Sequence, residues 1–446
     1  MMLRVLLCTA LLAVPAYAQP AQPAPPAPAP AKPAPAAGEL TMQLAVEIAM
    51  KQQPVLRQSR AQLEAARGRV DLVEASRRPQ ISLSAGVSAS GGGGAFNPAP
   101  GEPTRDFLDP NGGASVGASA SWRIYDFGQT AAQLRAANLN AQATAAGTTT
   151  TSLDVVSRVE LSFLEAVARA RLVTVADATV KSEEQHLDQA KRFVAAQAKD
   201  PIEVVQAQAR AANAKASLAQ AQSNAAIALA NLRASIGWVD PSQKIIVAQT
   251  WPASPDTPPA LVSLVDIARK QRPEIVQADR EIAAAEANID AARAGKRPVL
   301  SASARTDWSP QTGDNLPQPA WSVGVNLSWL LYDGGRTSAD VRIARANRES
   351  ALAERDALLL DLTSELDATR AQIEANQAAT QASQEAVIAA GAQLKLAEAR
   401  YAQGLGSQIE LADAQTAVTT AQGNLIQAEW QLANAWTNLR RALGTR

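Results

Sequence analysis

The sequence contains one cysteine and one histidine in 446 residues, and aromatic side chains make up only 4% of it. Zinc sites and nucleophilic catalysis of the Ser-His-Asp or Cys-His kind need more of these residues, so we expect no catalytic residue, no metal and no cofactor. The sole histidine, His186, lies among Glu183, Glu184 and Asp188, which indicates a solvated helix face rather than a metal site. We therefore do not expect an enzyme.

An excess of charge of one sign is also missing. Lys plus Arg and Asp plus Glu both number 42, and this balance gives no reason to expect nucleic acid as a partner. Much of the 47% apolar content is alanine. Alanine combined with Gln, Glu, Arg and Leu at helical spacing indicates long, closely packed helices. Beyond the N-terminal region no stretch is long and apolar enough for a transmembrane helix, so any membrane span would have to consist of strands.

The N-terminal segment has the pattern of an export signal. Arg4 provides a positive charge, a short apolar core follows, and Ala16-Tyr17-Ala18 forms a small-x-small cleavage site. We predict a signal peptide over residues 1–18 and a tether of mostly Pro, Ala and Gln over residues 19–38. Cys8 lies inside the apolar core and not at its cleavage end, so the signal for an acylated N-terminal cysteine is absent.

The remaining chain consists of two copies of one pattern. Gln53-Pro54 corresponds to Arg272-Pro273 at an offset of 219 residues. Tyr125-Asp126-Phe127-Gly128 corresponds to Tyr332-Asp333-Gly334-Gly335 at an offset of 207 residues. Each copy is predicted to contain helices, two strands, a long helix and a coiled-coil helix. The predicted units are repeat 1, an inter-repeat linker and repeat 2, over residues 39–237, 238–259 and 260–446.

Four segments alternate between apolar and polar residues, which predicts strands with one apolar and one polar face. They lie at about residues 80–90, 114–125, 299–308 and 320–332. Runs of about 10 residues with aromatics near their ends suit a transmembrane β-barrel, and the alternative is a pair of soluble hairpins packed on the helices. Because a barrel needs at least about 8 strands, membrane strands would require an oligomer. The predicted membrane-interface aromatics are Trp122, Tyr125, Trp308, Trp321, Trp329 and Tyr332.

Apolar residues follow a three-four spacing in the last helical segment of each copy. The series are Val204, Ala207, Ala211, Ala214 and Leu218 in the first copy and Leu411, Ala414, Val418, Ala421 and Leu425 in the second. A sustained repeat of 3.5 residues predicts a coiled coil, and alanine layers let the helix axes approach closely. The stretch from Gly128 to about Val194 contains no proline and would span roughly 100 Å as a helix, a length typical of a rod or a tube.

Over residues 39–446 the chain resembles the TolC family of outer-membrane channel proteins. The similar features are the two repeats, the basic-residue-plus-Pro start of each outgoing strand, the Trp-x-x-Tyr-Asp-x-Gly return to each long helix, and Tyr401-Ala402-Gln403-Gly404 before Ile409-Glu410. The resemblance implies a mainly α fold with a small β part. Three chains would form one twelve-stranded barrel in the outer membrane, continued through the periplasm by a helical barrel.

The resemblance also implies a function and its partners. The homotrimer would be a passive exit duct for efflux or type I secretion, docked to a periplasmic adaptor (membrane fusion) protein and an inner-membrane pump of the RND or ABC type. The rival function is a pore-less periplasmic coiled-coil adaptor or adhesin rod.

The family places its periplasmic gate and its docking sites in the helical turns. Glu410 and Asp413 occupy the positions of the acidic rings at the constriction, although the capping-box spacing from Ser407 gives Glu410 a structural alternative. The adaptor-docking turns would be Gly404-Leu405-Gly406 and Ala196-Gln197-Ala198, the latter without the Val-Gly-Leu-like motif of the family.

Overall fold

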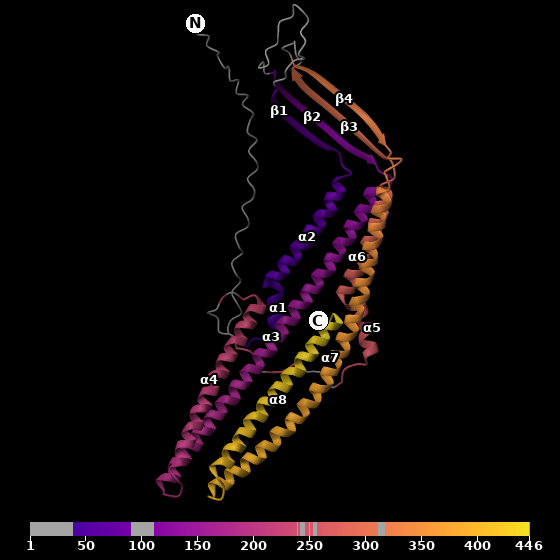
Figure 1. Ribbon diagram of the computed structural model, residues 1–446. Helices are drawn as coiled ribbons and strands as arrows, with labels where there is room; N and C mark the ends of the chain where they lie inside the picture. The colour runs from indigo at the N-terminus through magenta and orange to yellow at the C-terminus, as the bar shows by residue number, and fades with distance from the viewer. Residues whose placement is uncertain are drawn as a thin grey trace, which may run out of the picture.

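The computed structural model consists of a long helical bundle with a small sheet at one end (Figure 1). It describes residues 39–90, 111–238, 240, 246–248, 250–252, 257–310 and 317–445. The predicted signal peptide and tether, and part of the predicted linker, lie outside the described residues. In the described part of the chain, no helix has both the length and the apolar character that crossing a membrane requires.

Each half of the chain contributes two short helices, two strands and two long helices in the same order. The first half contains α1 (Met42–Gln52), α2 (Pro54–Ala75), β1 (Gln80–Ser90), β2 (Asn111–Tyr125), α3 (Gln129–Ala195) and α4 (Ile202–Ile236). The second half contains α5 (Leu261–Gln271), α6 (Pro273–Ala294), β3 (Val299–Pro310), β4 (Pro317–Ser328), α7 (Arg336–Ala402) and α8 (Gln408–Leu443). The predicted mainly α fold with a small β part is confirmed.

The sheet is antiparallel throughout, in the order β1-β2-β3-β4. The register places Ile81, Ala120, Ala304 and Val323 in one row across the four strands, and Ser82, Ser119, Arg305 and Ser322 in the next. Because successive residues of a strand point to opposite faces, the apolar residues of all four strands share one face of the sheet. The outer edges of β1 and β4 pair with no strand among the described residues.

The fourth strand ends earlier than predicted, at Ser328 rather than at residue 332. Trp329 and Tyr332 therefore lie in the connection to α7. The indole N–H of Trp329 donates to the backbone carbonyl of Lys296 (3.1 Å), and Trp122 donates in the same way to Arg77 (2.9 Å). These bonds satisfy carbonyl groups that follow the last turns of α6 and α2, so both tryptophans fasten the sheet to the helices.

The Tyr-Asp-x-Gly motif starts each of the two 67-residue helices. The carboxylate of Asp126 accepts a hydrogen bond from the backbone N–H of Thr130 (2.8 Å), and that of Asp333 accepts one from Thr337 (2.9 Å). The hydroxyl groups of both threonines donate to the same carboxylates. Since the first N–H groups of a helix have no partner within it, these side chains fix where α3 and α7 begin.

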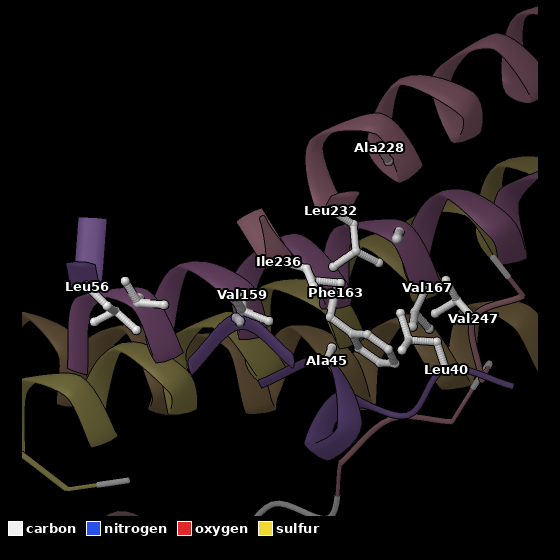
Figure 2. Packing of buried hydrophobic residues seen from close by; sticks show 13 residues of the cluster. Leu40, Ala45, Leu56, Val159, Phe163, Val167, Ala228, Leu232, Ile236 and Val247 are labelled. Atoms are coloured by element: carbon white, nitrogen blue, oxygen red, sulfur yellow. The ribbon is translucent and has the colours of Figure 1, made fainter. Parts of the chain in front are cut away.

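Two apolar clusters lie midway along the helices. Figure 2 shows the first, in which Phe163 of α3 contacts residues from α1 and α4. Leu362, Leu366 and Leu439 belong to the corresponding cluster of the second half. Below them α3 packs on α4 and α7 on α8 through small residues of the predicted series. The buried members of these series are Ala207, Ala211, Ala214, Leu411, Ala414 and Ala421.

Candidate functional site

The predicted docking and gate residues lie at the end of the molecule opposite the sheet (Figure 1). There α3 turns into α4 and α7 turns into α8. The residues Ala196, Gln197, Ala198 and Leu405 are all exposed, and Leu405 presents an apolar side chain that is 71% exposed. Of the predicted docking residues only Gly406 is buried, and the others are accessible in the single chain.

Both turns follow the same backbone path. Gln197 and Gly404 are equivalent at the offset of 207 residues, and both have a left-handed backbone, with φ of 55° and 74°. In each turn the next residue donates its N–H to the carbonyl five residues earlier, at 2.9 Å in both cases. This is the Schellman closure of a helix. The first turn thus keeps the conformation of the second without its glycine.

A hydrogen-bonded cluster joins the two turns. The Tyr401 hydroxyl donates to the Glu203 carboxylate at 2.9 Å, and the ammonium of Lys199 lies 3.6 Å from the other oxygen of that carboxylate. The side-chain amide of Gln408 donates to the Glu203 carbonyl at 3.0 Å. Tyr401 is 2% exposed, and its burial, together with the bond to Glu203, raises the pKa of the phenol to about 12.

An apolar surround holds Tyr401 in place. Its ring meets that of Phe193 edge to face, with centroids 5.7 Å apart, and the Lys199 ammonium lies 5.4 Å from its centre. Leu411 and Ala414 of α8 belong to the same buried cluster. The sequence marked Tyr401 only as part of a turn motif, because its partner Glu203 is 198 residues away.

The two predicted gate carboxylates differ in their partners. Glu410 and Asp413 are both exposed, three residues apart on α8. The Ser407 hydroxyl caps the helix by accepting from the Glu410 N–H (3.1 Å), whereas the Glu410 carboxylate lies 3.3 Å from the guanidinium of Arg400. Among the described residues no ion pair or hydrogen bond reaches the Asp413 carboxylate. Arg400 therefore offsets the negative charge of Glu410, whereas the charge of Asp413 has no such partner among the described residues.

A series of polar contacts joins α3 to α8, the inner helices of the two pairs. These contacts are Glu160–Arg440 (2.7 Å), Arg171–Glu429 (2.9 Å), Thr179–Thr419 (3.1 Å) and Ser182–Gln415 (3.1 Å). Within each pair, by contrast, the buried contacts are mostly alanine and leucine. Apart from the buried Gln415, these polar side chains are partly exposed, so replacing their contacts with water costs less than exposing the apolar contacts within each pair.

The predicted interface aromatics form two groups, and all six are at least 42% exposed. Tyr125 pairs with Leu300 at the helix end of the sheet, and Trp308 lies eight residues further along β3. At about 3.3 Å per residue this separation is about 26 Å along the strand. Because strands in such barrels tilt by about 35–45°, the two residues would be about 20 Å apart in height, within the roughly 25 Å of an outer-membrane apolar band.

His186 does not lie on a solvated helix face as predicted. It is half-buried, with its Nε2 3.2 Å from the Ser182 hydroxyl. Burial lowers the pKa of the imidazole, an effect that Glu183 and Glu398 oppose. Packing of α3 against the other long helices, which the local sequence does not reveal, accounts for the difference. No group of three or more His, Cys, Asp or Glu among the described residues could hold a metal ion.

Known proteins resemble the chain over most of its length. A sequence family described as "Outer membrane efflux protein" matches residues 45–238 and 264–445. The pyoverdine export outer membrane protein OpmQ of Pseudomonas aeruginosa is 24% identical over 331 residues, which cover 74% of this chain and 69% of OpmQ. The solved structure of the outer-membrane channel OprN has a TM-score of 0.73 at 24% identity, covering 91% of this chain and 90% of OprN. For CusC the TM-score is 0.76 at 20% identity, with 91% and 92% covered.

Proposed function

This chain belongs to the outer membrane efflux protein family, and we propose that three copies of it form the passive exit duct of a tripartite efflux or type I secretion system. The protein acts in efflux at the outer membrane, as its family does. The sheet carries the proposal, because its four strands have one continuous apolar face and two outer edges that pair with no strand in the described part of the chain. Four strands cannot close a barrel, whereas twelve strands from three chains can.

The apolar face favours a channel over a pore-less rod. Ile81, Leu83, Val87, Val323 and Val325 are each at least 67% exposed. A soluble rod would leave this contiguous apolar surface in water, whereas lipid would cover it in a barrel. The opposite face, with serines and Asn326, would line a wet lumen that the helices continue towards the turns.

The turns supply the closed end and the docking surface of the proposed duct. In a threefold assembly, Asp413 would form a ring of three carboxylates, with Glu410 and its Arg400 partner in a neighbouring ring. Opening would separate the α3–α4 pair from the α7–α8 pair at the Tyr401–Glu203 contact. The exposed residues of both turns would meet a periplasmic adaptor linked to an inner-membrane pump of the RND or ABC type.

Two adjacent arginine substitutions test the membrane position of the strands. Val325→Arg would place a charge on the lipid face and should impair assembly by about 2 to 4 kcal/mol, whereas Asn326→Arg would place it in the lumen and should mainly alter conductance. Light scattering of detergent-extracted protein reports the trimer, and planar-bilayer recordings report conductance. Equal tolerance of both substitutions, or a monomeric wild type that retains its β signal, would contradict the proposal.

Neutralising the turn carboxylates tests the gate. Crowded carboxylates attract cations, so the closed pore should be cation-selective and blocked by trivalent cations. Asp413→Asn should weaken both properties more than Glu410→Gln, because Arg400 already offsets the Glu410 charge. If a variant with both substitutions kept wild-type selectivity and block, the gate would lie elsewhere.

A further inference from the structure

We propose that a polar groove between α2, α3 and α6 binds a linear polyamine through its protonated amines. The groove has a volume of about 310 Å³ and lies far from the turns, where α2 and α6 flank α3 (Figure 1). Its lining is mostly polar and includes Ser59, Gln62, Thr144, Thr148, Gln277 and Glu281. Nothing in the exit-duct function requires such a lining, and the proposal does not depend on that function.

The threonines of α3 present hydrogen-bond acceptors to the groove. The hydroxyls of Thr144, Thr148 and Thr151 donate to the carbonyl groups four residues earlier on α3, at 2.9, 3.1 and 3.0 Å. A hydroxyl has a single proton, so each of these groups has only lone pairs left for a ligand. At 1.5 Å rise per residue these acceptors repeat every 4.5 to 6 Å, about the spacing of amines joined by three or four methylene groups.

The charge of the groove favours a cation. Glu281 contributes a carboxylate, one oxygen of which accepts from the Gln277 amide (2.9 Å). The amide oxygen of Gln277 faces α3, 3.1 Å from the position that a Cβ atom would have at Gly147. None of the described residues that line the groove is Lys or Arg. One carboxylate among neutral oxygens suits an ammonium better than a calcium ion, which takes several carboxylates.

The Ser59 hydroxyl adds another polar group to the wall of the groove. Ser59 is 6% exposed and lines the groove from α2. Among the described residues its hydroxyl has no hydrogen-bond partner, and its oxygen is not one of the fully buried unpaired atoms, so it is open to a ligand in the groove. A bound ammonium would donate to Ser59 and to the threonine oxygens on the opposite wall.

Isothermal titration of the detergent-solubilised full chain with spermidine tests the proposal. The titrations use an Asp413→Asn background, which removes the unpaired carboxylate of the turn. Glu281→Gln should weaken binding at least tenfold, and Thr148→Val, which keeps the side-chain shape, about threefold. Thr149→Val is the matched control, because the Thr149 hydroxyl also bonds within α3 (to the Ala145 carbonyl, 3.4 Å) but does not line the groove.

Three results would overturn the proposal. The first is the absence of saturable spermidine binding in the Asp413→Asn background. The second is binding that Glu281→Gln and Thr148→Val leave unchanged, which would place it elsewhere. The third is binding of MgCl₂ as tight as that of spermidine, which would identify a simple cation site. Circular dichroism of each variant verifies that the fold is retained, and the Thr149→Val titration reports any general effect of removing a hydroxyl from α3.

Discussion

The two halves of the molecule place different residues in the same left-handed backbone conformation. Phe127 (φ 52°) and Gln197 (φ 55°) in the first half correspond to Gly334 (φ 63°) and Gly404 (φ 74°) in the second. A residue with a side chain pays about 1 kcal/mol for this conformation, which glycine adopts freely. The packed helices on either side of the turns, rather than glycine, therefore set the path of the chain.

The turns also differ in what they contribute to the contact between the helix pairs. The second turn supplies the Tyr401 hydroxyl, whereas the equivalent residue of the first turn is Val194, which has no hydroxyl. Glu203 accepts from Tyr401, while its equivalent Glu410 pairs with Arg400 beside it. Duplicated carboxylates thus have separate roles, one in joining the turns and one at the mouth of the proposed pore.

The largest expected effect is a loss of stability on substitution of the glycines that end α4 and α8, and it should differ between the two halves. A Cβ atom at Gly444 would lie 2.9 Å from the Arg272 Cα, whereas one at Gly237 would lie 3.3 Å from the backbone of Gln52 and Gln53. Both glycines have positive φ. Gly444→Ala should lower the free energy of unfolding by about 3 kcal/mol and Gly237→Ala by about 1 to 2 kcal/mol. Denaturant titration of both variants measures these losses of stability. Equal losses would show that the two glycine sites do not differ in how well they tolerate a Cβ atom.

The next effect concerns Tyr401. Removing its hydroxyl in Tyr401→Phe deletes a hydrogen bond to a carboxylate and should shift the equilibrium towards the open duct by about 1.5 to 3 kcal/mol. Planar-bilayer recordings should show a larger or more often open conductance. Tyr332→Phe is the control, because the Tyr332 side chain is 85% exposed and far from the turns. If Tyr401→Phe kept the wild-type conductance, contacts other than the Tyr401–Glu203 hydrogen bond would hold the duct closed.

The same contact predicts an alkaline transition. The pKa of Tyr401 is raised to about 12 in this structure, above the ordinary value of about 10. The protonated phenol is therefore the form that the closed state favours. Its contribution is complete below pH 10 and is lost as the pH rises through about 12. Conductance recorded between pH 9 and pH 12 should rise in the wild type and change less in Tyr401→Phe.

The smallest expected effect is at the left-handed residues of the turns. Gln197→Gly should raise the free energy of unfolding by up to about 1 kcal/mol, and Gly404→Gln should lower it by about the same amount. Gln403→Gly is the control, because Gln403 has an ordinary helical backbone (φ −83°) and should lose stability on substitution. Opposite changes in the free energy of unfolding for Gln197→Gly and Gly404→Gln would show that the left-handed backbone determines the stability of both turns. Changes of the same sign would show that side-chain contacts determine it.

Periodicity predicted most of the fold. The shared apolar face of the strands and the coiled-coil spacing depend on residues close in sequence, and the repeats required only a comparison of one segment with another. The left-handed backbone at Gln197, like that at Gly404, became known only from the structure. The partners of the candidate site were not predictable in this way. Glu203 meets Tyr401 only after two helix pairs pack together, and Arg400 reaches Glu410 only across a turn. For the same reason the burial of His186 escaped the local sequence pattern.

The contacts between the two helix pairs also bear on how the proposed opening should respond to temperature. Parting Thr179 from Thr419 and Ser182 from Gln415 hydrates hydroxyl and amide groups, but opening at the Tyr401–Glu203 contact also hydrates the apolar cluster that joins Phe193 of α3 to Tyr401 and Leu411. The heat-capacity change of a transition comes mainly from newly hydrated apolar surface, so this cluster should give opening a positive heat-capacity change. The enthalpy of opening would then rise with temperature, and its van't Hoff plot would curve. Added salt would screen Arg171–Glu429 and Glu160–Arg440 and favour the open form.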